Sequence, residues 1–205
     1  SKTFDYICIQ WATVPTMLYR IMFLTHLIES GKITLTKEAK IVALVGERRL
    51  YASETKEVLL NTAPWEADSL WKAPETLPTD EREAAVFVWE QLKLPEALRE
   101  KEVLFVDARK QQGATRAETF DSTQTWLQAE NAKGKILMIS SSPYVPYQEA
   151  VMNYAIKKMG FDQQLQIEGA GSGSTWGKRE IEVELGLALD TLAREIFMEK
   201  QRLEL

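Results

Sequence analysis

Arginine, serine and tyrosine residues follow three separate apolar segments of the sequence, and together these residue types could bind an anion. Arg48 and Arg116 each come shortly after such a segment, and arginine binds phosphate or carboxylate groups through paired hydrogen bonds. Ser141, Ser142 and Tyr144 follow a third segment and precede a helical pattern, so they would lie beside the free N–H groups of a helix N-terminus. These residues predict a binding site for a phosphate or carboxylate group.

Other polar residues stand in comparable positions, and we count Gln10, Gly46 and Thr115 among the candidate ligand-binding residues. Glu47 directly follows an apolar segment and a glycine, which makes it the candidate catalytic acid or base, or a contact for a ribose hydroxyl. Thr115 has a second interpretation, because Thr-x-x-Glu at 115–118 is also the pattern of a helix capping box.

The sequence lacks the residues needed for several common kinds of active or binding site. Ser141 and Ser142 would need a base to act as nucleophiles, but the one histidine, His26, falls within a helical pattern and no G-x-S-x-G sequence occurs. One histidine and one cysteine cannot form a zinc site, and we predict no metal site. Cys8 lies in an apolar run and is expected to be buried. No glycine-rich dinucleotide or P-loop motif follows a predicted strand.

Apolar segments alternate with helical patterns along the chain, which is typical of βαβ units. We therefore predict a single α/β domain over residues 1–205, built as a three-layer Rossmann-like open parallel sheet of about five strands with helices on both faces. Right-handed crossovers bring the carboxyl ends of all strands to one edge of the sheet, where the candidate residues would meet. The predicted strands are 4–9, 40–45, 102–106, 136–139 and 165–168.

The helical patterns cover six further segments, with Asp80 and Thr115 as expected N-caps of the third and fourth. The segment 61–78 contains three prolines and two tryptophans without a clear period, and we expect a long irregular loop. A second, glycine- and serine-rich loop is expected over 169–177. The predicted helices are 15–30, 53–60, 81–92, 115–130, 146–159 and 178–201.

The bulk properties of the chain disfavour two classes of partner. A net charge of −5 and an isoelectric point of about 5.2 disfavour a nucleic-acid-binding protein. No apolar run approaches the roughly 18 residues of a membrane span. We therefore expect a cytoplasmic protein, with a periplasmic location behind an N-terminal anchor as the alternative.

The order of these segments resembles the YdcF/SanA/ElyC-like family, also called domain of unknown function 218. Tyr144 and Tyr147 stand where the family has histidine and arginine, and the glycines that follow the family's first strand are missing here. The resemblance implies a divergent member, an association with bacterial envelope processes and S-adenosylmethionine as a possible ligand. It is carried, in order, by 5–12 with Arg20, by Val45-Gly46-Glu47, by Glu81 or Glu83, by 114–118 and by 140–147.

Two functions from different classes follow. In the first, the protein binds a small anionic or nucleotide-like molecule at the strand-exit edge of the sheet. In the second, the fold is retained without chemistry and serves as an interaction module, with Trp65 and Trp71 in the loop 61–78 contacting a protein partner. A phosphate-ester hydrolase or transferase is the third and least favoured reading, because it needs a base or a metal.

Overall fold

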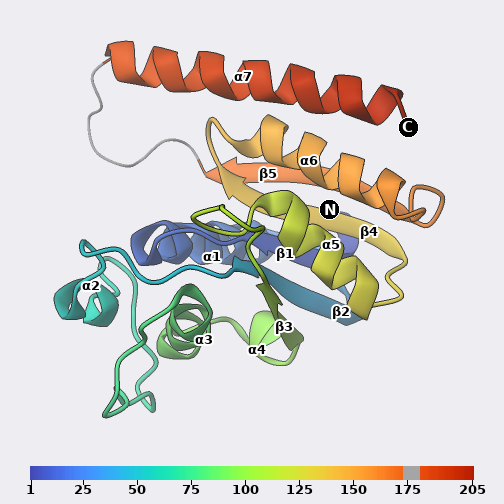
Figure 1. Cartoon of the computed structure of the whole chain (residues 1–205). Coiled ribbons are helices and arrows are strands. Elements are labelled where there is room, and N and C mark those ends of the chain that lie inside the picture. The colour runs from blue at the N-terminus through green and yellow to red at the C-terminus, as the bar shows by residue number, and fades with distance from the viewer. Residues whose placement is uncertain (173–180) are drawn as a thin grey trace.

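The computed structural model describes residues 1–172 and 181–205 and contains a five-stranded sheet in which every neighbouring pair is parallel. The strand order is β3-β2-β1-β4-β5, which confirms the predicted Rossmann-like sheet (Figure 1). The strands are β1 (Lys2–Gln10), β2 (Ile33–Gly46), β3 (Glu102–Ala108), β4 (Gly134–Ser141) and β5 (Leu165–Ser172).

Helices cover both faces of this sheet and bury two separate hydrophobic cores. On one face lie α1 (Val14–Glu29) and α3 (Glu81–Gln91), and on the other lie α5 (Thr119–Ala129) and α6 (Val145–Lys158). The three remaining helices are α2 (Lys56–Leu60), α4 (Glu96–Arg99) and α7 (Ile181–Leu203). The short helix α4 was not predicted.

The alternation of side chains along β1 explains why two cores are needed. Ile7 and Ile9 join the core under α1 and α3, whereas Tyr6 and Cys8 join the core under α5 and α6. Successive residues of a strand point to opposite faces, so a continuous apolar run identifies a strand that is covered on both sides. Cys8 is fully buried as expected, and this burial raises the pKa of its thiol.

The helix after β3 begins later than its sequence pattern suggested. The N-cap of α5 is Glu118, whose carboxylate accepts from the Asp121 N–H, while the Glu118 N–H donates to the Asp121 carboxylate over 2.8 Å. The prediction that Thr115 caps this helix was therefore wrong, because the second possible box, Glu118 with Asp121, satisfies both backbone groups. The predicted cap of α3 is confirmed, since Asp80 accepts from the Glu83 N–H over 2.8 Å.

Two strands extend beyond their predicted limits. β2 begins at Ile33, so the chain enters the sheet directly after α1 instead of at residue 40. β5 continues to Ser172 and includes Gly169 and Gly171, which were expected in a loop. A Cβ atom at either glycine would collide with the Val145 side chain of α6, so the glycines allow this helix to approach the strand closely. The rest of the predicted loop, 173–177, lies outside the described residues.

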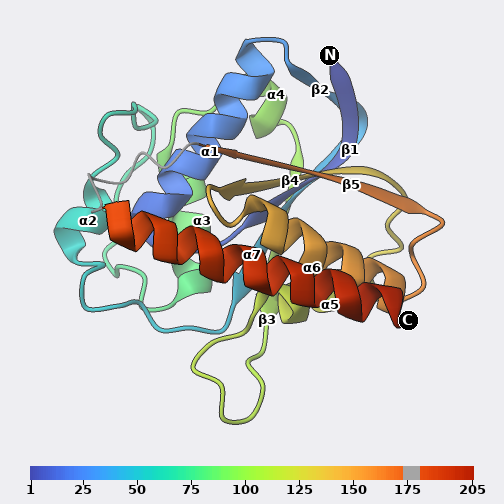
Figure 2. The same cartoon turned by 90° about the horizontal axis from the view of Figure 1, so that it is seen from above.

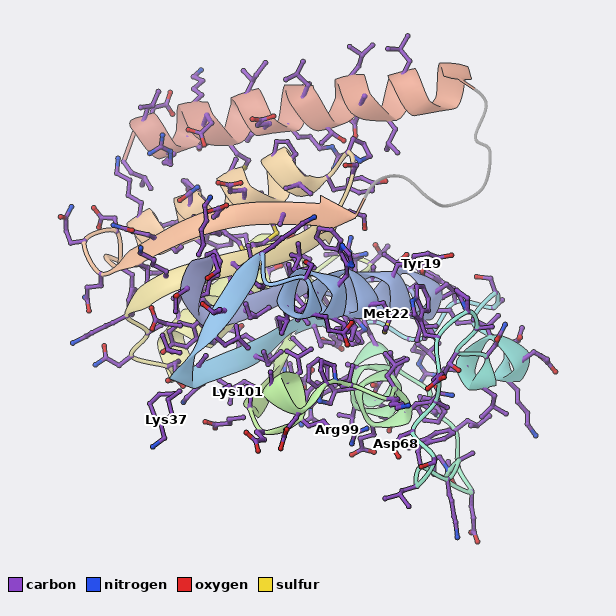
Figure 3. All side chains as sticks on the ribbon, turned by 180° about the vertical axis from the view of Figure 1, so that it is seen from behind. Tyr19, Met22, Lys37, Asp68, Arg99 and Lys101 are labelled. Carbon is purple, nitrogen blue, oxygen red and sulfur yellow. The ribbon has the colours of Figure 1, made fainter. Side chains whose placement is uncertain are left out.

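The loop 61–78 is tied to its surroundings. Asp68 forms an ion pair with Arg99 of α4, and both side chains are labelled in Figure 3. Trp65 packs edge-on against Tyr19 of α1 with ring centroids 4.5 Å apart. Trp71 packs in the same way against Phe87, at 5.2 Å. Both tryptophans are half-buried against the core, so the aromatic side chains on which the interaction-module hypothesis depended face inward.

The last helix lies outside the three layers. Figures 1 and 2 show α7 stacked on α6, on the side of α6 that faces away from the sheet. Thr191 of α7 is buried in this contact. Near the C-terminal end of α7, the Arg202 carbonyl accepts a hydrogen bond from the Lys157 ammonium of α6. In the described part of the chain, no helix combines the length and the apolar character needed to cross a membrane.

Candidate functional site

A cleft of about 630 Å³ opens at the carboxyl edge of the sheet, between the segments that follow β1 and β4. The strand order reverses at this point, because β2 and β3 are added on one side of β1 and β4 and β5 on the other. Open α/β sheets bind ligands at such a switch point, since two neighbouring loops diverge there and leave space. Five of the predicted residues line the cleft, namely Arg48, Arg116, Ser141, Ser142 and Tyr144.

The other predicted residues lie off the lining of this cleft. Gln10 is buried behind it, and its amide contacts the Met152 sulfur at 3.1 Å. Gly46 lets β2 approach the loop before α5, because a Cβ there would lie only 3.0 Å from the Ala117 Cβ. Thr115 is exposed in that loop. Residue type and strand order locate the correct edge of the sheet, but they do not say which way each side chain points.

Glu47, the candidate acid or base, is exposed outside the cleft. Its carboxylate accepts from the Lys110 N–H at 3.3 Å, and its own N–H donates to the Ala108 carbonyl at 2.7 Å. These bonds join the loop after β2 to the loop after β3. In this position Glu47 holds two loops together and does not reach a ligand in the cleft.

Arg48 lines the cleft but is already bound to protein carboxylates. Its Nη1 donates to Glu54 and its Nε donates to Glu81, both at 2.6 Å, and all three side chains are almost fully buried. Burial favours the neutral form of Arg48, but its two carboxylate partners outweigh burial and raise its pKa. Glu54 also accepts from the Val14 N–H at the start of α1 and from the Tyr51 N–H. Arg48 is therefore the centre of an internal ion-pair network.

Arg20 is part of the family resemblance, but it was not among the residues predicted to bind a ligand. It lies on α1 among Met17, Leu18 and Ile21, is only 3% exposed, and lines the floor of the cleft. The available signal was a charged residue on the apolar side of a helical pattern, four residues or fewer from three core positions. Such a residue must find polar partners inside the protein or at a site.

The partners of Arg20 are neutral. Its Nε donates to the Ser141 hydroxyl at 3.0 Å, and its Nη1 donates to the Gln10 carbonyl. Among the described residues, no carboxylate lies within ion-pair distance of Arg20 and no acceptor is bonded to its Nη2. Burial lowers the pKa of Arg20 to about 10, and the nearby Arg116 charge adds to this effect. The guanidinium still carries its charge at neutral pH.

Two more arginines border the cleft. Arg116 is half-buried before α5, and its Nε contacts the Ala117 carbonyl at 3.4 Å. Arg194 reaches the cleft from α7, where it pairs with Asp190 at 2.9 Å and lies 5.9 Å from the Tyr147 ring centroid. Glu118 is on the same wall, but its carboxylate caps α5. The floor of the cleft thus holds more guanidinium groups than uncommitted carboxylates.

Helix N-termini also face the cleft. Its lining includes Thr16 from the first turn of α1, Thr119 from the first turn of α5, and Tyr147 from the first turn of α6. The N-terminal ends of three helices therefore lie beside one volume, where their dipoles favour an anion. Few first-turn donors remain for it, because the Val14 and Asp121 N–H groups are already bonded to Glu54 and Glu118, and Pro15 and Pro146 have no N–H. Within the described ranges, histidine, cysteine and acidic side chains form no group of three that could hold a metal ion.

Comparison of the chain with protein-family models, with curated proteins and with solved structures finds no match.

Proposed function

We propose that this protein binds a small molecule through a phosphate or carboxylate group in the cleft between β1 and β4. The observation that carries the proposal is Arg20, a buried guanidinium whose two protein partners are neutral oxygens. Glu81 attracts Arg20 from a distance but forms no ion pair with it, and a bound anion would supply a direct counter-charge. The Arg116 charge repels that of Arg20, and an anion bound between the two guanidinium groups would be attracted by both.

Each group in the cleft has a role in this proposal. Arg20 and Arg116 contact the anionic group, and the exposed Ser142 hydroxyl and the Tyr147 N–H in the first turn of α6 complete its hydrogen bonds. The aromatic rings of Tyr144 and Trp11 flank the remaining space and provide contact surface for the rest of the molecule. Arg48 supports the wall through its carboxylate pairs and is not a ligand contact.

The size of the cleft favours a ligand larger than a free inorganic ion. Its volume of about 630 Å³ lies within the range that holds nucleotide-sized molecules. S-adenosylmethionine, which the resemblance to the YdcF/SanA-like family suggests, offers a carboxylate to the arginines but also carries a sulfonium cation. The arginine-rich floor therefore favours phosphate-bearing compounds, such as nucleotides and sugar nucleotides, over S-adenosylmethionine.

We assign no reaction to this site. Ser141 is the buried hydroxyl of the cleft, and its side-chain hydrogen bond is to the Arg20 guanidinium; among the described residues no side chain that could act as a base is bonded to it, and a base-activated nucleophile needs one. A binding role accounts for the arrangement with the groups that are present.

The test is a thermal-shift screen with inorganic phosphate, nucleotides, sugar nucleotides and S-adenosylmethionine, followed by calorimetry on each hit. A ligand at 100 times its dissociation constant stabilises the folded protein by about 2.7 kcal/mol, which shifts the melting temperature by several degrees. Arg20→Met and Arg116→Met should each abolish most of this shift. Arg49→Met is the matched control, because Arg49 is exposed on the loop after β2 and outside the cleft lining.

Two results would contradict the proposal. One is the absence of any shift across the screen. The other is a shift that persists at full size in Arg20→Met, because the ligand would then bind elsewhere or without the buried guanidinium.

A further inference from the structure

The helix α7 turns its apolar side chains away from the rest of the protein. Leu185, Leu189, Leu192 and Ile196 are between 50% and 61% exposed, and Leu203 is 75% exposed. These residues form one stripe along the outer side of α7, which we call the leucine stripe. A surface helix of a monomer normally buries such a stripe in its own core, so the leucine stripe lacks a partner in the described part of the chain.

The side of α7 that contacts α6 is mixed in polarity, with half-buried Leu187 and Met198 beside buried Thr191. Its buried point is Thr191, and Arg194 and Arg202 lie on the same side of the helix. Arg194 reaches the cleft, and the Arg202 carbonyl accepts from Lys157 of α6. In its described part, α7 therefore leaves most of its large apolar side chains exposed and uses few of them in its contact with α6.

The spacing of the leucine stripe is that of a coiled-coil seam. Leu185, Leu189, Leu192 and Ile196 follow one another at intervals of four, three and four residues, and Leu203 continues the same register one heptad after Ile196. Two helices with this spacing can pack along their whole contact, because a mean interval of 3.5 residues keeps the seam facing the partner helix. The 23 residues of α7 make a helix about 34 Å long.

We propose that α7 pairs with α7 of a second copy of this chain, side by side and in parallel. In this register Glu195 and Lys200 flank the seam on opposite sides, five residues apart. In a parallel coiled coil, two positions that flank the seam and are five residues apart in sequence face each other across the two helices. Glu195 of each copy would thus face Lys200 of the other, and two-fold symmetry forms the pair twice.

An antiparallel pair of full length is less favourable. It would bring the two Glu195 side chains together and would place Leu189 opposite Glu199 of the other copy. In the parallel pair the two Glu199 residues meet at the seam, but each already forms an ion pair with Arg202 of its own helix at 2.8 Å. The apolar part of the parallel seam is therefore Leu185 to Ile196.

The charge of α7 argues against a lipid surface as the occupant. Between residues 181 and 203 the sequence has five acidic and three basic residues, whereas helices that lie on membranes are rich in lysine and arginine on their polar face. The leucine stripe occupies one side of a single helix, whereas a stable protein–protein interface buries about 800 Å² per partner, usually from several elements. We therefore expect a dimer that forms with rising concentration and not a permanent one.

Sedimentation velocity over a wide range of protein concentration tests the proposal. The wild-type chain should shift from monomer toward dimer, and Leu189→Lys combined with Leu192→Lys should remain monomeric throughout. These side chains are exposed, so the circular dichroism of the variant should match the wild type. Leu70→Lys is the matched control, because Leu70 is 87% exposed in the loop 61–78, away from α7. This variant should dimerise like the wild type.

Charge reversal tests the parallel register. Glu195→Lys should raise the dimer dissociation constant about tenfold, and adding Lys200→Glu on the same chain should restore it. A wild type that stays monomeric at every concentration overturns the proposal, as does a dimer that survives the double leucine variant. A dimer insensitive to Glu195→Lys overturns the parallel pairing. Monomers that instead bind phosphatidylserine vesicles through Leu189 would show that the leucine stripe contacts lipid.

Discussion

Arg20 and Arg48 are both buried on the wall of the same cleft, but they are held in opposite ways. Arg48 donates to two buried carboxylates, Glu54 and Glu81, and its charge is more than compensated. Arg20 donates to a hydroxyl and a backbone carbonyl, and its pKa is lowered to about 10 by burial and by Arg116. One charge is paired with carboxylates built into the fold, and the other is bonded only to neutral oxygens, which is the basis of the proposed anion site.

The comparison shows why an arginine at the right edge of a sheet is not by itself a ligand contact. Arg48 occupies the more suggestive position in the sequence, directly after a buried strand, yet its donors are taken. Arg20 occupies a helix position that looks structural, yet it keeps donor capacity at the floor of the cleft. The ionic partners decide the role of each residue, and these partners come from distant parts of the chain.

The largest expected effect follows from breaking the Arg48 network. Arg48→Met leaves Glu54 and Glu81 buried without their cation, and removing one partner of a buried ion pair costs about 3–5 kcal/mol. Urea denaturation should show this loss, while Arg49→Met should unfold like the wild type. A loss below about 1 kcal/mol would mean that the network relaxes or takes up water, and would contradict the conclusion that Arg48 neutralises two buried carboxylates.

The two carboxylates of the network should differ at neutral pH. Burial raises the pKa of Glu54, but Arg48 and the N–H groups of Tyr51 and Val14 outweigh burial and hold it below its usual range. Burial dominates at Glu81 and raises its pKa despite Arg48. Glu54→Gln should therefore destabilise the protein by about 1–3 kcal/mol, and Glu81→Gln by clearly less. Equal losses in parallel urea titrations would contradict this order.

The opposite pKa shifts of Glu54 and Glu81 give opposite contributions to the pH dependence of stability. A carboxyl with a raised pKa in the folded state adds stability that is complete below its unfolded pKa and is lost as pH rises through its folded pKa. Glu81 should therefore make the wild type gain stability as pH falls toward about 4.5, and Glu81→Gln should lack this gain. Glu54 acts in the opposite sense, because its stabilisation is lost as pH falls through its lowered pKa. Free energies of unfolding measured between acid and neutral pH separate the two.

Arg20→Met should affect stability much less than Arg48→Met. It removes two hydrogen bonds to neutral acceptors but also removes a buried charge, so we expect a loss of about 1 kcal/mol in the absence of ligand. The difference between wild type and variant should grow when a bound phosphate compound is present, because only the wild type gains from it. If the loss without ligand equals that of Arg48→Met, the distinction between the two arginines fails.

The smallest effect should come from Ser141→Ala. It removes the acceptor that positions the Arg20 Nε, at a cost of about 0.5–1.5 kcal/mol in stability. Ligand affinity should fall by less than in Arg20→Met, because the guanidinium remains but is held less firmly. Calorimetry of both variants with the same ligand gives the comparison, and an equal loss in both would make Ser141 a direct ligand contact.

The sequence by itself determined the fold class, the central part of each strand, the α3 cap and the edge of the sheet where the cleft lies. These features depend on local patterns: continuous apolar runs, helical spacing, and a capping residue three positions from its partner. The burial of Cys8 and the placement of Ser141, Ser142 and Tyr144 at the cleft follow from the same patterns. A local pattern does not decide the structure where two possible capping boxes lie close together. At the start of α5 the sequence offers Thr115 and Glu118 as N-caps, and the structure uses Glu118.

Only the tertiary structure decided which polar groups are neutralised and which surfaces are covered. Glu81 lies 33 residues from Arg48, and Ser141 lies 121 residues from Arg20, so no local pattern reports these bonds. The outward direction of the leucine stripe likewise depends on how α7 lies on α6, which its own heptad spacing does not reveal. Charge compensation and burial are properties of the space around a residue, and that space is assembled from segments far apart in the chain.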